Sequence, residues 1–292
     1  MSTVHLVDAS LYVFRAWHAM PDEFHDAGGW PVNAVHGFAR FLLDLLERQK
    51  PGHIAVAFDE ALDSCFRNQL YPAYKANRDP APEELKRQFG HCQRLCRALG
   101  LPVLADARYE ADDLIGSTLS HVRQAGHHGL IISADKDLSQ LLAGRDQQWD
   151  FARGERWDAE GVKARYGVHA HQVADFLGLT GDAIDNIPGV PGIGAKTAAA
   201  LLEHFGSLDA LLERLDELPF LRLRGARRHA QSLQEHRQIA LLSRQLATIV
   251  LDAPLPSDLG QAERRDADRE ALEQLCEQLR FGPLSRRRLL SA

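Results

Sequence analysis

Three short apolar runs, each closely followed by an aspartate, constrain the fold of this chain more than any other feature. The runs are Val4–Val7, Ile54–Phe58 and Leu130–Ser133, and the aspartates are Asp8, Asp59 and Asp135. Runs of this length, rich in β-branched residues and bounded by polar or turn residues, predict buried strands. Between them lie segments such as Val35–Leu46, whose apolar residues recur at helical spacing. This alternation predicts an α/β fold with a mostly parallel sheet flanked by helices.

The pattern changes from about Ala170, where short helical segments are joined by Gly and Pro turns. Helices are clearest over Leu201–Leu215 and Gln231–Leu246, and Glu270–Leu279 predicts a last helix that packs back on the body. The polar segment Pro254–Asp268 is typical of a loop. We therefore expect three parts with a first boundary near Tyr166–His171: an α/β core over 1–170, an all-helical unit over 171–255 and a helical tail over 256–292.

The composition is that of a soluble globular protein. The chain has 292 residues, 45% hydrophobic and 25% charged, and neither a membrane-spanning apolar stretch nor a signal peptide. Its four cysteines, Cys65, Cys92, Cys96 and Cys276, are too sparse for a disulfide framework, so we expect a reducing cytoplasm. His91, Cys92 and Cys96 could belong to a zinc site, but no second ligand cluster matches them. Their interpretation as ordinary helix residues is favoured.

The strand-end aspartates are the first candidate site. Ligands of an open parallel sheet bind outside the carboxyl ends of its strands, so Asp8, Asp59 and Asp135 would meet at one edge. A single aspartate in such a place is usually a helix cap or a turn residue. Three at equivalent positions are harder to explain in that way.

More acidic residues accompany them. Glu110, Asp112 and Asp113 stand at the apparent start of a helix, where acids suit the helix dipole, yet three acids within four residues repel one another unless a cation lies between them. Asp137, Asp182 and Asp185 complete a set of nine. Oxygen ligands without a His or Cys pattern favour Mg²⁺ or Mn²⁺ over Zn²⁺. Two such ions can activate water and stabilise a leaving oxygen, so the acids indicate metal-assisted phosphoryl chemistry.

The net charge of −6 argues against a nucleic-acid partner only if it is spread evenly. Removing the nine candidate metal ligands from 40 acidic residues leaves 31 against 34 basic residues, a balance of +3. The basic residues also cluster, although either cluster alone could be a solvated helix face. The clusters are Arg67, Lys75, Arg78, Lys86, Arg87, Arg94 and Arg97, and then Arg222, Arg224, Arg227, Arg228, Arg237 and Arg244.

The glycine-rich run 189–197 allows two interpretations as a phosphate-binding motif. A nucleotide-binding P-loop needs Gly-Lys-Ser/Thr in succession after a strand, whereas Ala195 separates Gly194 from Lys196 and no strand precedes the run. A helix–hairpin–helix fits better: Gly192 and Gly194 allow a tight turn, the next helix directs N–H groups at a phosphate, Lys196 adds charge and Thr197 a hydroxyl donor. Such contacts grip the backbone of DNA without reading bases. A simple turn between packed helices is the alternative.

Taken together, these residues resemble the 5′ nuclease (flap endonuclease) family, especially the N-terminal 5′→3′ exonuclease region of bacterial DNA polymerase I. The matching blocks follow the family order over roughly residues 1–250. They are Leu6–Ser10 with Arg15, Val56–Asp59, Phe66–Tyr71, Tyr74–Arg78, Tyr109–Asp113, Ser133–Asp137 and Gly181–Gly194. The resemblance implies a PIN-like core, a helical arch at about 64–90, and a helical DNA-binding unit that contains the hairpin.

The resemblance also implies roles for individual residues. Asp8, Asp59, Glu110, Asp112 and Asp113 would hold chiefly one metal ion, Asp135, Asp137 and Asp182 the other, and Asp185 would be an outer ligand. Lys75 and Arg78 would be catalytic, neutralising charge on the scissile phosphate. Arg15 and Arg67 would contact substrate phosphates. Family members also bind a monovalent cation, often K⁺, near the hairpin.

The function implied is a structure-specific 5′→3′ exonuclease and 5′-flap endonuclease that uses two metal ions in DNA replication and repair. Because the chain ends at Ala292, we expect a free-standing monomer that works with a DNA polymerase in trans. Two alternatives stay open at this point. One is a non-catalytic protein that binds DNA junctions, and the other is an RNA-cleaving PIN-type nuclease.

Overall fold

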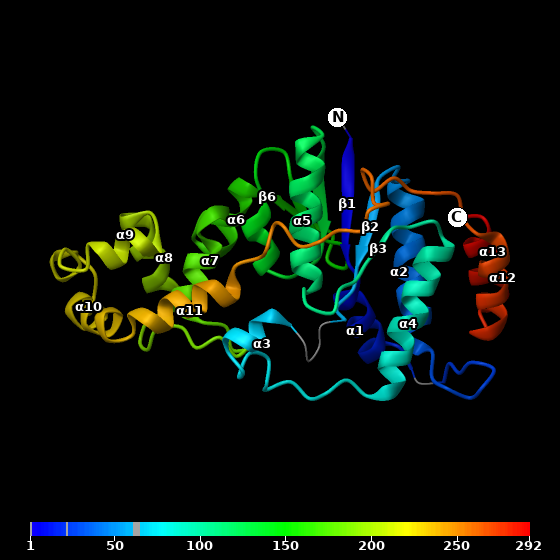
Figure 1. The fold of residues 1–292 in the computed structure, drawn as a ribbon, viewed down its shortest axis with the longest axis horizontal. Coiled ribbons are helices and arrows are strands. Elements are labelled where there is room, and N and C mark those ends of the chain that lie inside the picture. The colour runs from blue at the N-terminus through cyan, green and yellow to red at the C-terminus, as the bar shows by residue number, and fades with distance from the viewer. Residues whose placement is uncertain (1, 22, 61–64) are drawn as a thin grey trace.

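A six-stranded sheet forms the centre of the computed structural model, which describes residues 2–21, 23–60 and 65–292 (Figure 1). The strands lie in the order β3-β2-β1-β4-β5-β6, and all neighbours are parallel except β5 and β6. The strands are β1 (Thr3–Asp8), β2 (Ile54–Ala57), β3 (Val103–Leu104), β4 (His128–Ile132), β5 (Gln147–Asp150) and β6 (Glu155–Asp158). The three strands predicted from the sequence are confirmed, and so is the mostly parallel sheet.

The strand order reverses between β1 and β4. From β1 the chain adds β2 and β3 on one side, and β4 then returns to the other side of β1. Asp8 pairs with Ala57, and Val7 pairs with Ile132, so these strands end at one level. In open α/β sheets, ligands bind at such a reversal, outside the carboxyl ends of the strands. This register brings Asp8, Asp59 and Asp135 to a single edge.

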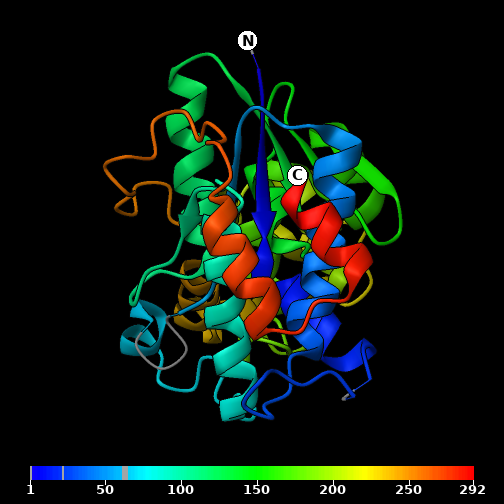
Figure 2. The same cartoon turned by 90° about the vertical axis from the view of Figure 1, so that its right-hand side faces the viewer.

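Helices cover both faces of the sheet. On one face, Val7, Val56 and Ile132 pack with residues of α1 (Ala9–Ala19), α2 (Asn33–Gln49), α4 (Glu83–Ala98) and α12 (Arg269–Gln278). On the other face, Leu6 and Ile131 pack against α5 (Ala111–Gln124). Figure 1 shows α5 on one side of the strands and α2, α4 and α12 on the other, and Figure 2 looks onto the second layer, with α12 in front. Alternate strand residues therefore enter two separate hydrophobic clusters, as the period of a strand requires.

The second half of the chain is helical. It contains α6 (Ala159–Tyr166), η2 (Ala170–Gln172), α7 (Val173–Thr180), α8 (Ala195–Phe205), α9 (Leu208–Glu213), η3 (Leu218–Phe220), α10 (Ala226–Glu235) and α11 (Arg237–Ala247). Leu201–Leu215, predicted as one helix, is therefore two. Gly206 ends α8 with a φ of 86°, and the Ser207 hydroxyl caps α9 by accepting from the Ala210 N–H at 3.1 Å. The Gly-Ser pair was the sequence signal for this break.

The second predicted helix, Gln231–Leu246, is also interrupted. His236, with φ −111° and ψ 24°, leaves the helical conformation between α10 and α11. α11 packs along α7, whereas α10 is tied to the hairpin by the Ser232 hydroxyl, which donates to the Pro191 carbonyl at 2.7 Å. Because the two halves follow different partners, tertiary packing decides the break, and no glycine or proline marks it.

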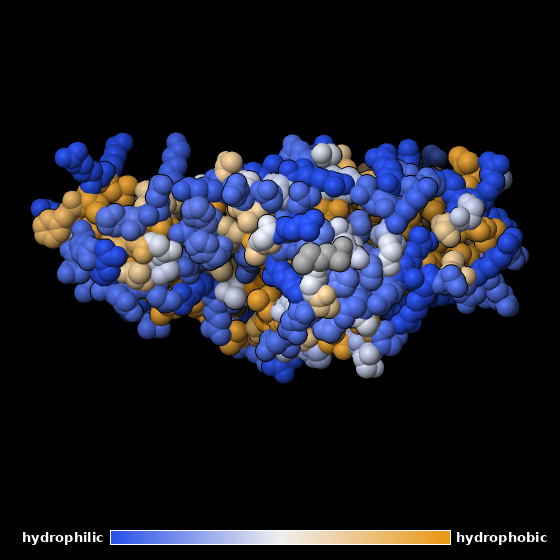
Figure 3. Space-filling model, turned by 90° about the horizontal axis from the view of Figure 1, so that it is seen from above, coloured by the Kyte–Doolittle hydropathy of each residue, from blue (hydrophilic) through white to orange (hydrophobic). Residues whose placement is uncertain are grey.

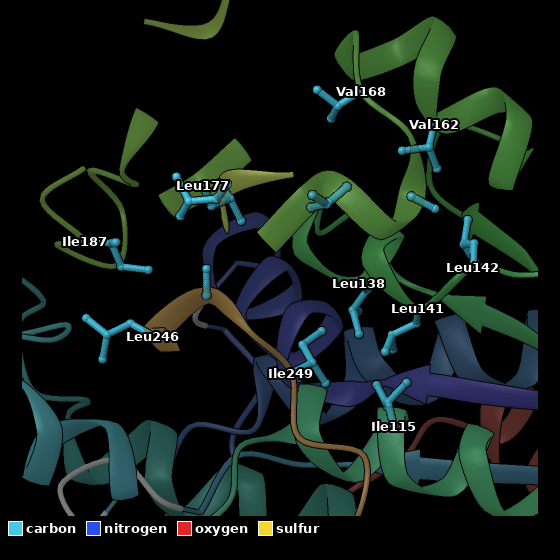
Figure 4. Packing of buried hydrophobic residues seen from close by; sticks show 14 of the residues in the cluster. Ile115, Leu138, Leu141, Leu142, Val162, Val168, Leu177, Ile187, Leu246 and Ile249 are labelled. Atoms are coloured by element: carbon cyan, nitrogen blue, oxygen red, sulfur yellow. The ribbon is translucent and has the colours of Figure 1, made fainter. Parts of the chain in front are cut away.

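The helical part shares a core with the sheet. One continuous cluster joins Ile115 of α5, Leu141 of η1 (Asp137–Leu141), Leu177 of α7 and Leu246 of α11 (Figure 4). All four side chains are buried. Burial of apolar surface across this junction holds α7, and the hairpin that follows it, in a fixed position relative to the strand ends.

The C-terminal segment returns to the sheet, as the sequence predicted for Glu270–Leu279. Residues 254–268 contain neither helix nor strand, and α12 then packs on α4. A further helix that was not predicted, α13 (Pro283–Leu290), contacts α2, where the Arg288 guanidinium pairs with Asp44 at 2.7 Å. Both helices lie at the opposite end of the long axis from α10 (Figure 1).

The segment predicted as a helical arch, about 64–90, is only partly helical. Residue 64 lies outside the described residues. α3 (Phe66–Leu70) is followed by turns up to Pro82, and α4 then begins at Glu83. Because Leu85 and Gln88 are buried against the body, only the turn-rich stretch 71–82 crosses between α3 and α4 (Figure 1).

The buried cysteines and the surface complete this description. Cys92 and Cys96 lie in the hydrophobic cluster under α4 as ordinary packing residues, and all four cysteines are free. Seen from above, the surface is mostly hydrophilic, with scattered apolar residues (Figure 3). Over the described ranges, no helix has the length and apolar character that crossing a bilayer requires.

Candidate active site

The acids at the carboxyl edge are joined by short polar residues. Ser133, directly after β4, donates its hydroxyl to Asp8 Oδ2 at 2.8 Å and accepts from the Asp135 N–H at 3.0 Å. Asp59 accepts from the Ala111 N–H at 2.8 Å, while its own N–H donates to the Ser10 hydroxyl at 2.9 Å. These bonds connect the ends of β1, β2 and β4 with the start of α5. Neither Ser133 nor Ser10 was predicted as a site residue from the sequence.

Four acids, Asp8, Asp112, Asp135 and Asp137, form a crowded group that we call the pocket acids. Burial, together with the nearby charge of Asp59, raises the pKa of Asp8 to about 7. Burial, followed by repulsion from Asp135 and Asp8, raises the pKa of Asp112 well above its ordinary value. Burial and then Asp135 do the same to the pKa of Asp137. The ionised forms are thus destabilised by their neighbours.

One oxygen of this group has no hydrogen-bond partner. Asp137 Oδ1 is buried and unpaired within the described part of the chain, whereas most buried polar atoms in proteins are satisfied. An unsatisfied carboxylate oxygen among like charges is a favourable place for a cation. The donor set therefore fits a hard divalent ion in its chemistry. Among the described residues, however, no three Asp, Glu, His or Cys side chains are gathered closely enough to hold an ion without moving.

Lysine side chains form ion pairs with several of the remaining acids. Lys75 Nζ contacts Glu110 Oε1 and lies 3.7 Å from Asp185, and Lys136 Nζ lies 2.6 Å from Asp182. Burial would lower the pKa of Lys75, but Glu110 outweighs it and raises that pKa well above its usual range. Burial would raise the pKa of Asp182, but the nearby Lys136 outweighs it, and that pKa is lowered from its ordinary value. The lysines thus act as internal cations where the carboxylates face each other.

A pair of loops distant in sequence delivers Lys75 to this position. Lys75 has a φ of 55°, which is uncommon for a residue other than glycine, and its N–H donates to the Asp185 carbonyl at 3.0 Å. Asn186, also at φ 55°, donates its side-chain amide to the Ala73 carbonyl at 2.6 Å. Arg78 pairs with the Asp185 carboxylate. The two loops fix each other, so the predicted catalytic pair Lys75 and Arg78 reaches the acid edge.

Arg67 is almost fully buried, which disfavours its predicted contact with substrate phosphates. Its guanidinium has five N–H donors, and each has an acceptor. Nε donates to the Leu246 carbonyl at 2.8 Å, Nη1 to Glu110 at 2.9 Å and to Asp113 at 2.7 Å, and Nη2 to Asp113 at 2.8 Å and to the Thr248 carbonyl at 3.0 Å. We call Arg67, Glu110 and Asp113 the Arg67 clamp.

Asp113 is equally occupied by hydrogen bonds, which disfavours its predicted role as a metal ligand. Oδ1 accepts from Arg67 and from the Val250 N–H at 2.9 Å, and Oδ2 accepts from Arg67 and from the Glu110 N–H at 3.1 Å. Four bonds fill the accepting capacity of a carboxylate. With no exposed surface, Asp113 joins α3, the first turn of α5 and the segment 248–250 after α11. It is a structural residue, one position away from a pocket acid.

Tyr74 is a further site residue that the sequence analysis quoted within a motif without giving it a role. Its hydroxyl donates to Glu110 Oε2 at 3.0 Å and lies 3.3 Å from Asp185 Oδ2. Burial raises the pKa of Tyr74, so the phenol stays a donor at all ordinary pH values. It bridges the Arg67 clamp and the outer acid Asp185. Its position directly before Lys75 was the only available signal.

Arg15 is half-exposed on α1, and its phosphate contact stays a prediction. Its guanidinium lies 3.4 Å from Asp150, at the end of β5, and 5.9 Å from the centre of the Tyr12 ring. Asp150 is buried, so the arginine is held at the surface of the acid edge by one weak ion pair.

The hairpin between α7 and α8 has the shape that phosphate binding requires. Gly192 has a φ of 81°, and a Cβ added at Gly194 would meet no atom within 4 Å. α8 begins after Gly194 without a side-chain cap, and Lys196 is exposed in its first turn. An open surface in front of uncapped N–H groups lets a phosphate approach closely. The role of Thr197, which is partly buried there, stays a prediction.

Two family models match the chain over most of its length. The first is described as 5′-3′ exonuclease, N-terminal resolvase-like domain, and matches residues 3–167. The second is described as 5′-3′ exonuclease, C-terminal SAM fold, and matches residues 168–270.

Curated relatives are DNA polymerases I. The chain is 42% identical over 278 residues to DNA polymerase I of Pseudomonas aeruginosa, which covers 94% of this chain and 30% of that protein. It is 40% identical over 285 residues to the enzyme of Chloroflexus aurantiacus, covering 95% of this chain and 29% of that protein. The chain thus spans about 30% of the length of these relatives.

Solved structures share the fold. A T5 5′-exonuclease with bound zinc has a TM-score of 0.69 and 21% identity, with 99% of this chain and 97% of that chain covered. The catalytic core of Rad2 in complex with a DNA substrate has a TM-score of 0.66 and 15% identity, with 99% and 91% covered. At these identities the likeness extends to the fold alone.

Proposed function

The chain belongs to the 5′-3′ exonuclease family, and from this premise we propose that it is a divalent-metal-dependent nuclease that cuts DNA at 5′ ends and flaps. The observation that carries the proposal is the set of pocket acids, whose raised pKa values and unpaired Asp137 oxygen call for a cation. An acid group that served folding alone would be satisfied, as Asp113 is.

The proposed metal is Mg²⁺ or Mn²⁺, in two or more ions. Asp8, Asp59, Glu110 and Asp112 would hold one, and Asp135, Asp137, Asp182 and, as an outer ligand, Asp185 would hold the other. When bound, such ions supply Lewis acidity to the phosphate and lower the pKa of bound water. The side chains of Lys75 and Lys136 then have to leave their carboxylates, because cation and lysine compete for the same oxygens. A K⁺ ion at the hairpin is part of the same proposal.

The chain's own cations have a second role once displaced. Lys75, whose backbone is strained, lies at the acid edge. Beside it is Arg78, whose side chain is half-exposed. Released from Glu110 and Asp185, both can contact the phosphate that is cut and stabilise the charge that develops on it. Both residues are bonded to the loop 182–186, and the hairpin follows this loop in the chain. The position of Lys75 and Arg78 is therefore tied to that of the hairpin.

Duplex DNA is the proposed ligand of the hairpin. Gly192, Gly194, Lys196 and Thr197 would grip one strand through its phosphates, without base contacts. A DNA polymerase is the proposed partner, because the relatives are DNA polymerases I, of which this chain matches about 30%. In this proposal the nuclease removes the 5′ ends that synthesis displaces.

Cleavage of a labelled 5′-flap DNA with Mg²⁺ tests the proposal. We expect a 5′-phosphorylated product, with loss of cleavage in the Asp135→Ala/Asp137→Ala variant, which removes two pocket acids. Binding without cleavage in the unsubstituted protein would identify a non-catalytic junction protein instead. Faster cleavage of the matching RNA flap would identify an RNA nuclease.

A further inference from the structure

The arginines around the start of α10 are unlike the other basic residues of the helical part. Arg222, Arg224, Arg227 and Arg228 are all exposed, and no acid occurs between Leu218 and Gln234. Elsewhere in this part, Arg214 pairs with Glu217 at 2.7 Å and Arg244 with Asp209 at 2.8 Å. Among the described residues, none of these four arginine side chains has an ion pair or a hydrogen bond.

The stability of α10 does not account for them. Arg227 and Arg228 occupy the first turn, where the positive end of the helix dipole makes a cation unfavourable. Gly225 precedes the helix and offers no side-chain cap. Four clustered cations without an acidic partner, two of which oppose the helix dipole, are explained by an anionic ligand.

The hairpin lies directly beside this surface. A Cβ added at Gly192 would come 4.0 Å from Arg228 Nη2, and Ser232 of the same helix donates to the Pro191 carbonyl at 2.7 Å. α10 therefore continues the hairpin surface away from the acid edge. In Figure 1 the order along the long axis is α3, α11 and α10, so α10 lies at the far end from the sheet.

We infer that these four arginines form a second contact with the DNA duplex, which extends the grip of the hairpin along the same sugar-phosphate backbone. The inference rests on the proposed function, because it takes the hairpin to bind duplex. The arginines are spaced along a helix start and a loop, where they meet phosphates without reading bases. The protein then senses how far duplex extends from the cut site.

The test compares flap substrates whose duplex arm is shortened one base pair at a time. Fluorescence anisotropy gives affinity for the unsubstituted protein and for the variant Arg227→Gln/Arg228→Gln. On a long duplex we expect the variant to bind roughly tenfold more weakly, with a salt slope smaller by about 1.8, since each lost phosphate contact removes about 0.9. On the shortest arms, which cannot reach α10, the two proteins should bind equally.

A matched control removes the same charge elsewhere. Arg286 and Arg287 are exposed on α13, at the opposite end of the molecule, so Arg286→Gln/Arg287→Gln should leave affinity and salt slope unchanged. Equal loss on long and short arms, or an equal loss in the control variant, would overturn the inference. So would unchanged affinity of the α10 variant on every arm, which would point to a protein partner.

Failure of this inference is distinguishable from failure of the proposed function. Cleavage of a short-arm flap does not involve α10, so the α10 variant should cut it at the rate of the unsubstituted protein. If the unsubstituted protein cuts no flap at all, the proposed function is wrong. If it cuts and the length dependence is the same in both proteins, only the α10 contact is wrong.

Discussion

The pocket acids and the Arg67 clamp meet at the first turn of α5 but differ in how their charges are balanced. The carboxylates of the clamp are paired with an arginine, whereas those of the pocket acids repel one another. Asp113 is saturated by four hydrogen bonds, two of them from the bidentate Arg67, and has no exposed surface. Asp112, its neighbour in sequence, is repelled by Asp135, Asp8 and Asp59, which together with burial raise its pKa. The comparison teaches that a run of acids can serve two purposes, one residue for folding and the next for a cation.

The sharpest way to break this comparison is to remove the acid of the clamp. Asp113→Ala leaves two guanidinium nitrogens of Arg67 without their carboxylate in a buried place. We expect the free energy of unfolding to fall by about 3–5 kcal/mol, the usual effect of breaking one half of a buried ion pair. Urea denaturation with EDTA present measures it. Undiminished stability, with a lost response to Mg²⁺, would return Asp113 to the metal ligands.

The pH dependence of stability separates the two groups by sign. Glu110 in the clamp has a pKa held below its ordinary 4.5, because Lys75 and Arg67 outweigh burial, so its stabilisation is lost as the pH falls below that value. Asp8 has a pKa raised to about 7, so its stabilising effect is present at low pH and is lost as the pH rises from 3.8 through 7. Each contributes up to about 1.4 kcal/mol per pH unit across its window.

The metal-free protein should therefore lose stability as the pH rises from 3.8 towards 7, and Mg²⁺ should raise its melting temperature more at pH 8 than at pH 5.5. Cations bind ionised carboxylates, so metal binding replaces the protons that the pocket acids share. Differential scanning fluorimetry at both pH values, with EDTA or with Mg²⁺, measures the difference. An equal gain at both values contradicts the crowding of these acids.

Removing one pocket acid should have the reverse sign of the clamp variant. Asp112→Asn keeps the shape of the side chain but deletes a charge that its neighbours repel. We expect metal-free protein at pH 8 to be stabilised by on the order of 1 kcal/mol, while Mg²⁺ loses part of its stabilising effect. Thermal melts of both variants beside the unsubstituted protein decide the matter. A destabilised Asp112→Asn would place this residue with the clamp.

The smallest effect on stability is expected at the lysine whose side chain is partly exposed to solvent. Lys136 pairs with Asp182, but 41% of its side chain is accessible, so Lys136→Met should change stability by less than about 1 kcal/mol. Because the lysine competes with a metal ion for Asp182, the variant should need less Mg²⁺ for half-maximal cleavage. A Mg²⁺ titration of flap cleavage gives that concentration. An increased requirement would mean that Lys136 acts on the substrate.

The sequence predicted the parts of the site that follow from local rules. The period and composition of Val4–Val7, Ile54–Phe58 and Leu130–Ser133 defined three strands, and the rule for parallel sheets placed the aspartates after them at one edge. The Gly-rich run 189–197 defined the hairpin by the same kind of reasoning. These features depend on neighbours in sequence or on the symmetry of a sheet.

The sequence could not sort the acids into ligands and structural residues. Asp112 and Asp113 have the same side chain and similar neighbours in sequence. Arg67 is of a residue type that commonly contacts DNA phosphates. Their difference arises from atoms far away: the Leu246 and Thr248 carbonyls and the Val250 N–H complete the clamp. Hydrogen bonds between residues up to 181 positions apart leave no periodic pattern in the sequence.

The sequence alone determined the α/β sheet, the edge at which its acids meet and the glycine-rich hairpin. Strand period, parallel connection and glycine geometry are local properties. Only the tertiary structure decided which acids are satisfied, how Lys75 reaches them and that α10 continues the hairpin. The physical reason is that burial and charge pairing act through space: a carboxylate becomes a clamp or a candidate ligand according to the partners that folding brings within about 3 Å of it.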